Sequence, residues 1–357
     1  MTIQFVTFGM FIIDEFSFAD EQGKPTGKTV APQIGGGGTY AIIGARIWLS
    51  PDTLGMIIDR GNDFPQDMQN RLLTYGSDIW HFRDDTNRLT TRSRNSYKGQ
   101  FRGFEYITPR IRLTPRDLER TRLTRPASVH FICSPTRALQ IVSEIQEVEE
   151  WNPTTIFEPI PDRCIPEELP SLKAVLPHIT ILSPNAEEAL SLLSLPLIVT
   201  KSAVENAASE FLKMGVGKEN SGSVIIRSGA LGAYVMTSDK KGRWIDAFWS
   251  SAENIDNLMV VDVTGDSLGK YSHGRDHTDK KLGAGNSFLG GLAAGLSITN
   301  GNVYEAALYA SVSASFTVQQ LGLPHLTVGS NGVEEWNQDS PHRRLEVLRQ
   351  RQDRNIK

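Results

Sequence analysis

Two glycine-rich segments have the residue types and spacing of anion-binding sites. The run Gly-Ala-Gly-Asn at 283–286 stands directly before an apolar helix pattern at 288–296. Small residues at a helix start leave backbone amides unpaired, and these amides together with the helix dipole bind phosphate or a developing oxyanion. Four glycines at 35–38, before the helix pattern 41–49, would let the backbone approach a ligand closely. Neither segment is a Walker A loop, because no Lys-Ser or Lys-Thr follows at the required spacing.

The elements that must position these segments follow the rhythm of an α/β protein. Short β-branched runs alternate with helical patterns, as in a mainly parallel sheet with crossover helices. Ser202 with Glu205 has the spacing of a capping box and indicates a helix start. Asn302 with Glu305 indicates another. We predict strands at residues 3–13, 54–59, 129–133, 155–157, 179–182, 224–227 and 258–261.

The composition narrows the class of protein. Of 357 residues, 39% are hydrophobic and 22% are charged, as in an ordinary globular protein. The formal net charge of −4 argues against a uniformly basic nucleic-acid binder. No apolar stretch approaches about 18 residues and the first residues lack the basic region of a secretory signal, so we expect a cytoplasmic protein without a membrane-spanning helix. Two cysteines are too few for a disulfide framework or a cysteine zinc site.

Residues 81–125 differ in charge from the rest of the chain. They carry 12 Arg and Lys residues against 5 Asp and Glu residues. Polar strand patterns at 92–95, 100–102 and 105–107 indicate a hairpin-like insertion. Two interpretations stay open: a solvated basic face, which charge runs usually are, or a positively charged lid over an anionic ligand.

Five motifs, in one order along residues 1–325, resemble those of the ribokinase-like (PfkB) carbohydrate and nucleoside kinases. They are Asp14 at the end of the first predicted strand, the glycine run with Thr39, the sequence Asn-Ala-Glu-Glu at 185–188, the strand and turn at 224–232, and the helix start at 283–286. Within this family, segments 9–15, 37–40, 88–92 and 335–337 are similar to the fungal Mak-type branch, linked to killer-virus maintenance. The resemblance implies an α/β fold: a mainly parallel central sheet flanked by helices, with a small β-sheet lid.

The resemblance also implies an activity and a site. The activity is transfer of the ATP γ-phosphate to a hydroxyl of a sugar, nucleoside or related small molecule. The implied substrate-binding residues are Asp14, Gly36, Gly37 and Thr39, to which the arginine-rich segment adds Arg92. The implied catalytic residues are Gly283, Ala284, Gly285 and Asn286. The implied nucleotide contacts are Asn185, Arg227, Gly229, Gly232, Thr264 and Ser311. Asn185 and Glu188 would arrange Mg²⁺ and its waters, and a monovalent cation would lie near Asp262.

One position departs from the family pattern. The family's signature ends in an Asp that takes the proton from the substrate hydroxyl, and this chain has Asn286 there. An amide can orient a hydroxyl but cannot accept its proton. General-base catalysis contributes about 10²–10⁴-fold, so we expect a slow kinase. The alternative is a catalytically inactive pseudokinase that acts as a nucleotide- or RNA-associated binding or assembly protein.

The arginine-rich segment suggests a substrate class. Cationic side chains near a sugar pocket would suit a substrate that carries phosphate or carboxylate, because guanidinium pairs bidentately with both groups. The candidates are Arg92, Arg94, Lys98 and Arg102. Arg227, where the family usually has Thr, would add a cation near the nucleotide. The resemblance further implies a homodimer through the lid, with a small molecule rather than nucleic acid or a membrane as the main partner.

The domain boundaries follow from the position of the lid. We expect a large α/β domain at 1–14, 35–85 and 113–330, a lid at 15–34 and 86–112, and a helical tail at 331–357. Residues 266–283 interrupt a family-like sequence Asp-Val-Thr-Gly-Ala-Gly-Asn, and their removal restores it. We hypothesise that this inserted loop is a retained intron; the alternative is a genuine surface loop. Transcript reads that cross the segment without a splice junction would overturn the hypothesis.

Overall fold

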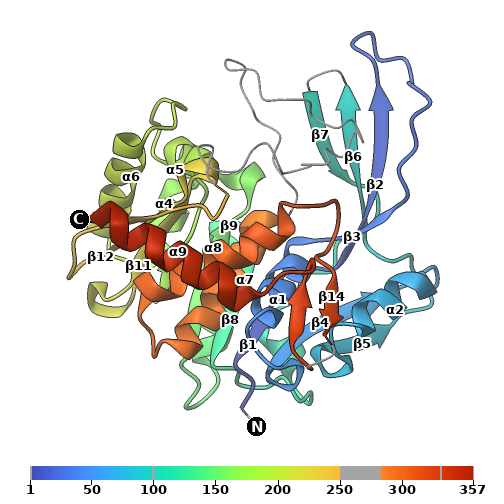
Figure 1. Cartoon of the computed structure of the whole chain (residues 1–357), viewed down its shortest axis with the longest axis horizontal. Helices are drawn as coiled ribbons and strands as arrows, with labels where there is room; N and C mark the ends of the chain where they lie inside the picture. Colours follow the sequence, from blue (N-terminus) through green and yellow to red (C-terminus); the bar gives the residue numbers. More distant parts are fainter. Residues whose placement is uncertain (1, 99–100, 250–282, 330–331, 357) are drawn as a thin grey trace.

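The computed structural model describes residues 2–98, 101–249, 283–329 and 332–356. Within these residues the central sheet has nine strands, all running in one direction except the second strand from one end, which is antiparallel to both its neighbours (Figure 1). This confirms the predicted mainly parallel α/β sheet. The strands lie in the order β13 (Arg243–Ile245), β12 (Ala233–Thr237), β11 (Ser223–Arg227), β10 (Ile181–Leu182), β9 (Thr154–Pro159), β8 (Ser128–Cys133), β1 (Phe5–Thr7), β4 (Leu54–Arg60) and β5 (Trp80–Asp84).

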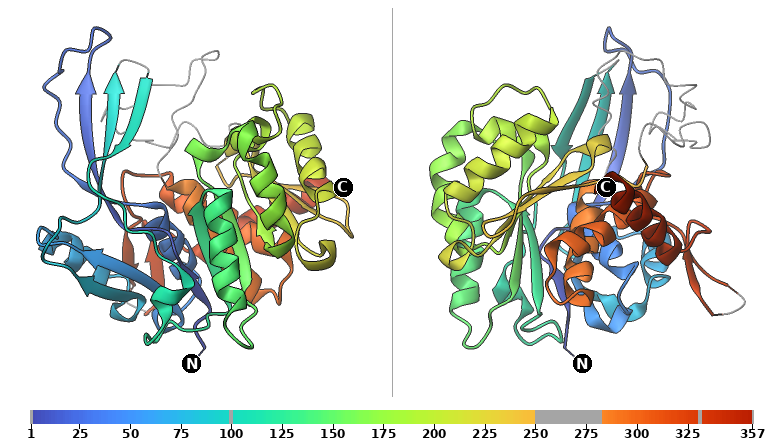
Figure 2. Two further views of the ribbon diagram at one scale, coloured as in Figure 1. Left: turned by 180° about the vertical axis from the view of Figure 1, so that it is seen from behind. Right: turned by 60° about the vertical axis from the view of Figure 1, so that its left-hand side comes forward.

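Helices cover both faces of the central sheet (Figure 2). Alternate strand residues supply the two cores: Val224 and Ile226 belong to one, whereas Ile225 belongs to the other. The strands are therefore buried on both sides, as parallel strands with crossover helices require. One face carries α1 (Gly37–Arg46), α7 (Ala284–Ile298) and α8 (Val303–Thr317). The other face carries α3 (Pro135–Gln146), α4 (Leu169–Val175), α5 (Ala186–Leu192) and α6 (Lys201–Lys213). A further helix, α2 (Gln66–Leu73), connects β4 to β5.

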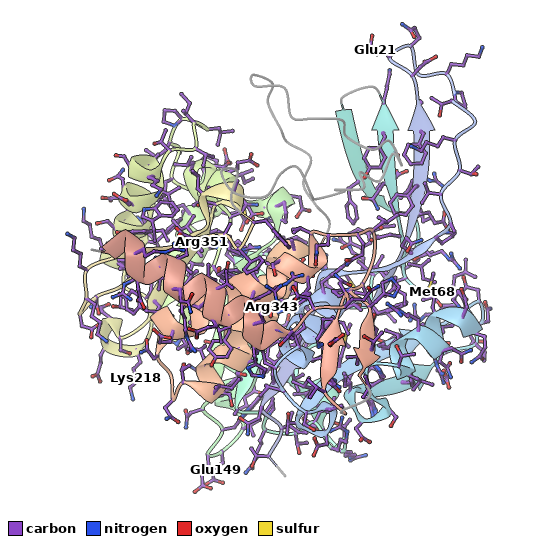
Figure 3. The ribbon with its side chains drawn as sticks, viewed as in Figure 1. Glu21, Met68, Glu149, Lys218, Arg343 and Arg351 are labelled. Carbon is purple, nitrogen blue, oxygen red and sulfur yellow. The ribbon has the colours of Figure 1, made fainter. Side chains whose placement is uncertain are left out.

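A second sheet of four strands stands at the carboxyl edge of the central sheet and forms the lid. Glu21, in the turn after its longest strand, marks its outer end, on the opposite side of the molecule from Glu149 and Lys218 (Figure 3). The lid strands lie in the order β3 (Gln33–Gly35), β2 (Ile12–Ala19), β6 (Arg92–Lys98) and β7 (Phe101–Tyr106).

The first strand differs from the prediction. Residues 3–13 contribute to two different sheets, because β1 ends at Thr7 and β2 begins at Ile12. The chain turns between them where Gly9 lies against the start of α1, and a Cβ on Gly9 would stand 2.5 Å from the amide nitrogen of Gly38. Asp14 therefore lies on a lid strand and not at the end of a central strand.

The structure corrects one predicted helix start and confirms another. α6 begins at Lys201, and the hydroxyl of Thr200, rather than that of Ser202, accepts the amide of Ala203 at 3.1 Å. Asn302 caps α8 as predicted. The predicted helical tail also contains β15 (Glu334–Trp336), which pairs with β14 (Leu326–Val328) before α9 (Pro341–Ile356) packs on α8. Among the described residues, no helix is long and apolar enough to cross a bilayer.

α1 and α7 are packed backbone to backbone. A Cβ on Gly44 of α1 would collide with the carbonyl oxygen of Ser287, and a Cβ on Gly290 of α7 would collide with that of Ala41. The two helices therefore approach each other at positions that lack side chains. Since the glycine run at 35–38 leads into α1 and the Gly-Ala-Gly-Asn run opens α7, this contact places the two segments side by side.

Candidate active site

The carboxyl ends of the parallel strands bring several polar residues to one edge of the central sheet. Glu158 is near the end of β9, Asn185 follows β10, and Arg227 is the last residue of β11. α7 begins at this edge and the lid rises from it (Figure 1). Ligands of open α/β sheets bind outside this edge, which makes it the candidate site.

The glycine run before α1 contacts both Asp14 and Asn286. A Cβ on Gly35 would collide with the carboxylate of Asp14, and a Cβ on Gly37 would stand 2.9 Å from Nδ2 of Asn286. The missing side chains let both polar groups approach the backbone closely. Asp14 is only 5% exposed and accepts a hydrogen bond from the hydroxyl of Ser93 on β6. The structure thus brings the predicted substrate carboxylate and the predicted catalytic amide to one loop.

Gly36 and Thr39 lie at the same start of α1. Gly36 is the N-cap, with a φ of 90° that favours glycine, and a Cβ there would collide with the carbonyl oxygen of Met10. Thr39 is fully buried, and its hydroxyl has no hydrogen-bond partner among the described residues. Buried polar groups are nearly always satisfied, so this unpartnered hydroxyl is consistent with a ligand beside the glycine run.

The first turn of α7 has the geometry of an anion site. Gly283, at its N-cap, has a φ of 82° and a ψ of −11°, and a Cβ there would collide with the ring of Tyr40. The amides of the first turn, from Ala284 to Asn286, cannot be satisfied by the helix itself, and the positive end of the helix dipole lies behind them. Backbone donors are therefore available where the sequence predicts them.

Asn286 is held in place by a buried carboxylate. Its Nδ2 donates to Oε2 of Glu158 at 2.6 Å, and Nε2 of His130 lies 3.3 Å from the same oxygen. His130 is fully buried, with its Nδ1 at 3.0 Å from the hydroxyl of Thr7. An ionised carboxylate only accepts hydrogen bonds, so Asn286 turns its NH₂ group to Glu158 and keeps Oδ1 for another partner.

Arg227 supplies the positive charge of this cluster. Its Nη2 lies 2.8 Å from Oε1 of Glu158 and 3.7 Å from Oε2 of Glu188, and donates to the carbonyl oxygen of Ser183 at 3.1 Å. Burial alone would raise the pKa of Glu158, but the charge of Arg227 and the hydrogen bond with His130 outweigh it and hold that pKa below its ordinary value. Glu158 is therefore ionised at neutral pH and is a poor proton acceptor.

Asn185 and Glu188 are engaged with each other. Oδ1 of Asn185 accepts the amide of Glu188 at 2.8 Å, and the two carboxylate oxygens of Glu188 accept N–H groups of Asn185 at 2.7 and 2.6 Å. This reciprocal pair is a capping box at the start of α5. Mg²⁺ takes oxygen ligands, yet each side-chain oxygen of the pair already accepts a hydrogen bond, and Arg227 stands beside Glu188. As direct Mg²⁺ ligands the two residues do not fit.

The other predicted nucleotide-binding residues that the structure describes lie in the turn after β11 and on α8. Gly229 and Gly232 lie in the turn after β11 with φ values of 56° and 91°. Ser311, on α8, donates its hydroxyl to the carbonyl oxygen of Asp246 at 2.8 Å. The predicted strand 258–261, residues 266–282 of the inserted loop, Thr264 and Asp262 lie outside the described residues.

The register of the lid separates three of the four predicted cations from Asp14; the fourth, Arg102, is paired with Tyr97, two positions from Asn95 on the same side as Ser93. Asp14 is paired with Ser93, and Tyr106 stands opposite Ser93 on β7, so these three side chains share one face of the lid. The alternate positions of β6 point to the other face. They carry Arg92, Arg94 and Lys98.

Arg92 is therefore not brought to the pocket. Its guanidinium lies 2.6 Å from Asp63 and 3.0 Å from Glu15, and Arg94 lies 3.5 Å from Glu105. These side chains do not form a cationic lid over an anionic substrate, because residues at alternate positions of a strand face opposite ways and Asp14 lies on the other face. On this face of β6, Arg92 and Arg94 are paired with carboxylates.

Sequence reasoning missed Glu158 and His130. Each is the one acidic or basic residue of a largely buried strand, and the predicted strand 155–157 stops one residue before Glu158. A charged residue among the last positions of a buried parallel strand is the signal that identifies such a group, because that end faces the ligand edge.

Two fungal proteins resemble the chain over most of its length, although no family model matches it. An uncharacterised protein of Schizosaccharomyces pombe is 33% identical over 357 residues, which cover 96% of this chain and 92% of the relative. Protein MAK32 of Saccharomyces cerevisiae is 32% identical over 338 residues, which cover 89% of this chain and 85% of the relative.

Solved structures of sugar and nucleoside kinases share the fold. Arabidopsis thaliana ribokinase, solved with ribose and ATP, matches 98% of this chain and 99% of its own with a TM-score of 0.61 at 17% identity. Anopheles gambiae adenosine kinase matches 90% of this chain and 97% of its own with a TM-score of 0.65 at 15% identity. Taken with the two fungal relatives, this fold shows that the chain belongs to the ribokinase-like (PfkB) family, in the branch of MAK32.

Proposed function

We propose that the protein is an ATP-dependent phosphotransferase that moves the γ-phosphate to a hydroxyl of a sugar, nucleoside or related small molecule. The observation that carries the proposal is the approach of Asp14 and Asn286 to one glycine run beside the start of α7. A carboxylate that can accept hydrogen bonds from substrate hydroxyls thereby lies next to backbone amides that suit a phosphoryl group. The likeness to ribokinase and adenosine kinase supports ATP as the donor.

In this proposal Asn286 orients the acceptor hydroxyl. Its Nδ2 is committed to Glu158, so Oδ1 accepts the substrate O–H and leaves an oxygen lone pair directed at phosphorus. The backbone amides at the start of α7 stabilise the charge on the transferring group. The bond from the substrate oxygen to phosphorus forms as the bond to the β-phosphate oxygen breaks, and the hydroxyl proton leaves to water.

Glu158 does not replace the missing base. Its pKa is depressed by Arg227 and His130 despite its burial, so it has little tendency to take a proton. Phosphoryl transfer nevertheless depends mainly on positioning and charge stabilisation, because its transition state is loose in most analyses. We therefore expect slow turnover rather than none.

The test is substrate-dependent ADP release from ATP, measured with a panel of sugars and nucleosides. Asn286→Asp alone would place a carboxylate against Glu158, and repulsion would raise the pKa of that new acid. Asn286→Asp combined with Glu158→Gln reverses the 2.6 Å contact, so that the amide at 158 donates to the carboxylate at 286. For this double variant we expect a kcat about 10²–10⁴-fold above that of the wild type.

Two further variants complete the experiment. Asp14→Asn should abolish the substrate-dependent release of ADP, because the side chain loses an acceptor of substrate hydroxyls. Arg116→Gln, at an exposed ion pair with Glu147, is the matched control and should change nothing. If the folded double variant binds ATP but shows no substrate-dependent ADP release, the kinase proposal is overturned and a nucleotide-binding protein remains.

A further inference from the structure

We propose that Arg227 is the resident counter-ion of the nucleotide phosphates and takes the place of a divalent cation held by Asn185 and Glu188. The inference rests on the proposed function, because it concerns the nucleotide at that same edge of the sheet. The ligand class is the polyphosphate end of a nucleotide without a bound metal ion.

The guanidinium of Arg227 lies across the first turn of α7. A Cβ on Gly285 would collide with Nη1 of Arg227, so the missing side chain lets the cation reach the helix start. A phosphate oxygen that accepts hydrogen bonds from the first-turn amides would stand next to this guanidinium. The helix dipole and the arginine both favour negative charge at one place.

Arg227 retains donors for this role. Its side chain is 11% exposed, and the contacts with Glu158, Glu188 and Ser183 all use Nη2. Nε is buried and has no partner in the described part of the chain. A guanidinium carries five N–H donors in a rigid fork, so phosphate oxygens can be bound while the ion pair with Glu158 persists.

Both carboxylates around Arg227 have stabilising partners within the protein. Glu158 forms an ion pair with Arg227, and Glu188 lies in the first turn of α5, where the helix dipole stabilises a carboxylate. A divalent cation on Glu188 would stand close to Nη2 of Arg227, which is 3.7 Å from Oε2 of Glu188. Like-charge repulsion therefore disfavours a metal at the position that the family resemblance implies.

A second observation also argues against a metal ion held by side chains at this edge of the sheet. Over the ranges that the structure describes, no group of three or more His, Cys, Asp or Glu side chains is arranged to hold a metal ion. The carboxylates at this edge are instead engaged by protein donors: Glu158 by Arg227, His130 and Asn286, and Glu188 by Asn185. The protein thus supplies its own cation to the site.

The test measures nucleotide binding rather than turnover. A non-hydrolysable ATP analogue is titrated into the protein in a calorimeter, once with EDTA and once with Mg²⁺. For the wild type we expect dissociation constants that differ by less than about threefold between the two buffers.

The variants remove the cation together with Glu158, the carboxylate in closest contact with it, while Glu188 keeps its hydrogen bonds with Asn185. Arg227→Thr combined with Glu158→Gln deletes both members of the ion pair. Metal-free binding should weaken about 10–100-fold, the value of a charge-assisted hydrogen bond, and Mg²⁺ should restore part of it. Arg227→Lys keeps the charge and should retain an intermediate affinity. Arg116→Thr, on the surface beside Glu147, is the control and should bind as the wild type does.

Each outcome decides the proposal. Wild-type binding that falls about tenfold or more in EDTA would overturn it and leave the kinase proposal standing. Equal metal-free binding by the wild type and the double variant would also overturn it. No binding to the wild type in either buffer would overturn both proposals. The wild-type comparison alone decides the matter if the double variant does not fold.

Discussion

Arg227 at the carboxyl edge of the central sheet and Arg92 in the lid use the same side chain differently. Both are largely buried, with 11% and 18% of the side chain exposed, and both have two carboxylate neighbours. Nε and Nη2 of Arg92 donate hydrogen bonds to Asp63, and its Nη1 donates one to Glu15. Arg227 makes its ion pairs through Nη2 alone, keeps an unpartnered Nε, and has its Nη1 next to Gly285 of α7. One arginine ties the lid together, and the other remains able to bind a ligand.

A high local density of charged residues in the sequence therefore does not locate a ligand site. Arg92 comes from the basic segment 81–125, where carboxylates are close at hand, whereas Arg227 ends the apolar strand β11. Charged side chains are almost never buried unless they are paired, so a lone charge at the end of a buried strand points to a specific partner. Position at the sheet edge is the better guide.

The largest expected effect is on folding stability at the sheet edge. Arg227→Met leaves the buried carboxylate of Glu158 without its cation and should lower the free energy of unfolding by about 3–5 kcal/mol. Arg92→Met leaves two partly solvated carboxylates and should lower it by about 1 kcal/mol. Urea denaturation of both variants measures the difference. Equal losses would break the distinction between the two arginines.

Two glycines of the lid sheet, one against Asp14 and one in β7, give the next effect. Gly35→Ala would drive a methyl group into the carboxylate of Asp14, so we expect a loss of about 1–3 kcal/mol in the free energy of unfolding and weaker substrate binding. Gly103→Ala, in lid strand β7, meets only Ser96 at 3.7 Å and should change stability by no more than about 0.5 kcal/mol. Thermal unfolding compares the pair, and a Gly35 variant as stable as the Gly103 variant would contradict the close approach.

The sheet edge should also lose stability in acid. The pKa of Glu158 lies below its ordinary value of 4.5, so its stabilising contribution is complete above pH 4.5 and is lost as the pH falls through the lowered pKa. Glu158→Gln cannot titrate, so its stability should fall less steeply below pH 4.5 than that of the wild type. Urea denaturation at a series of pH values tests this, and parallel curves for the two proteins would count against a depressed pKa.

The smallest effect should come from the outer face of the lid. Arg94 and Glu105 are 3.5 Å apart, with 43% and 60% of their side chains exposed. Solvent screens such a pair, so Arg94→Ala should change the free energy of unfolding by less than about 0.5 kcal/mol. A loss as large as that of Arg227→Met in the same denaturation series would show that the lid carries charges as important as those of the sheet edge.

Local patterns predict much of the central sheet. The strands predicted at 54–59, 129–133 and 224–227 match β4, β8 and β11 to within a residue at each end. Hydrophobic runs and turn residues are short-range signals, which explains this agreement. The break after Thr7 is different in kind, because the apolar run continues to Ile13 and only the contact of Gly9 with Gly38 interrupts it.

The site is predictable only in part. Resemblance leads to Asp14, Arg227 and Asn286, which the structure places at one edge of the sheet. Strand register, which puts Arg92 on the far face of the lid, is not written in the local pattern of a polar strand. The partner of Asn286 is no more accessible to sequence reasoning, because Glu158 is 128 positions away in the chain.

The glycine contact between α1 and α7 makes the site vulnerable from a distance. Gly44 and Gly290 are not among the predicted ligand-binding residues, yet a methyl group at either position would push the two helices apart. The loop that faces the acceptor and the helix end that faces the phosphate would then separate, with every pocket residue unchanged. Loss of activity in a natural variant at these positions would have a cause that inspection of the pocket alone would not reveal.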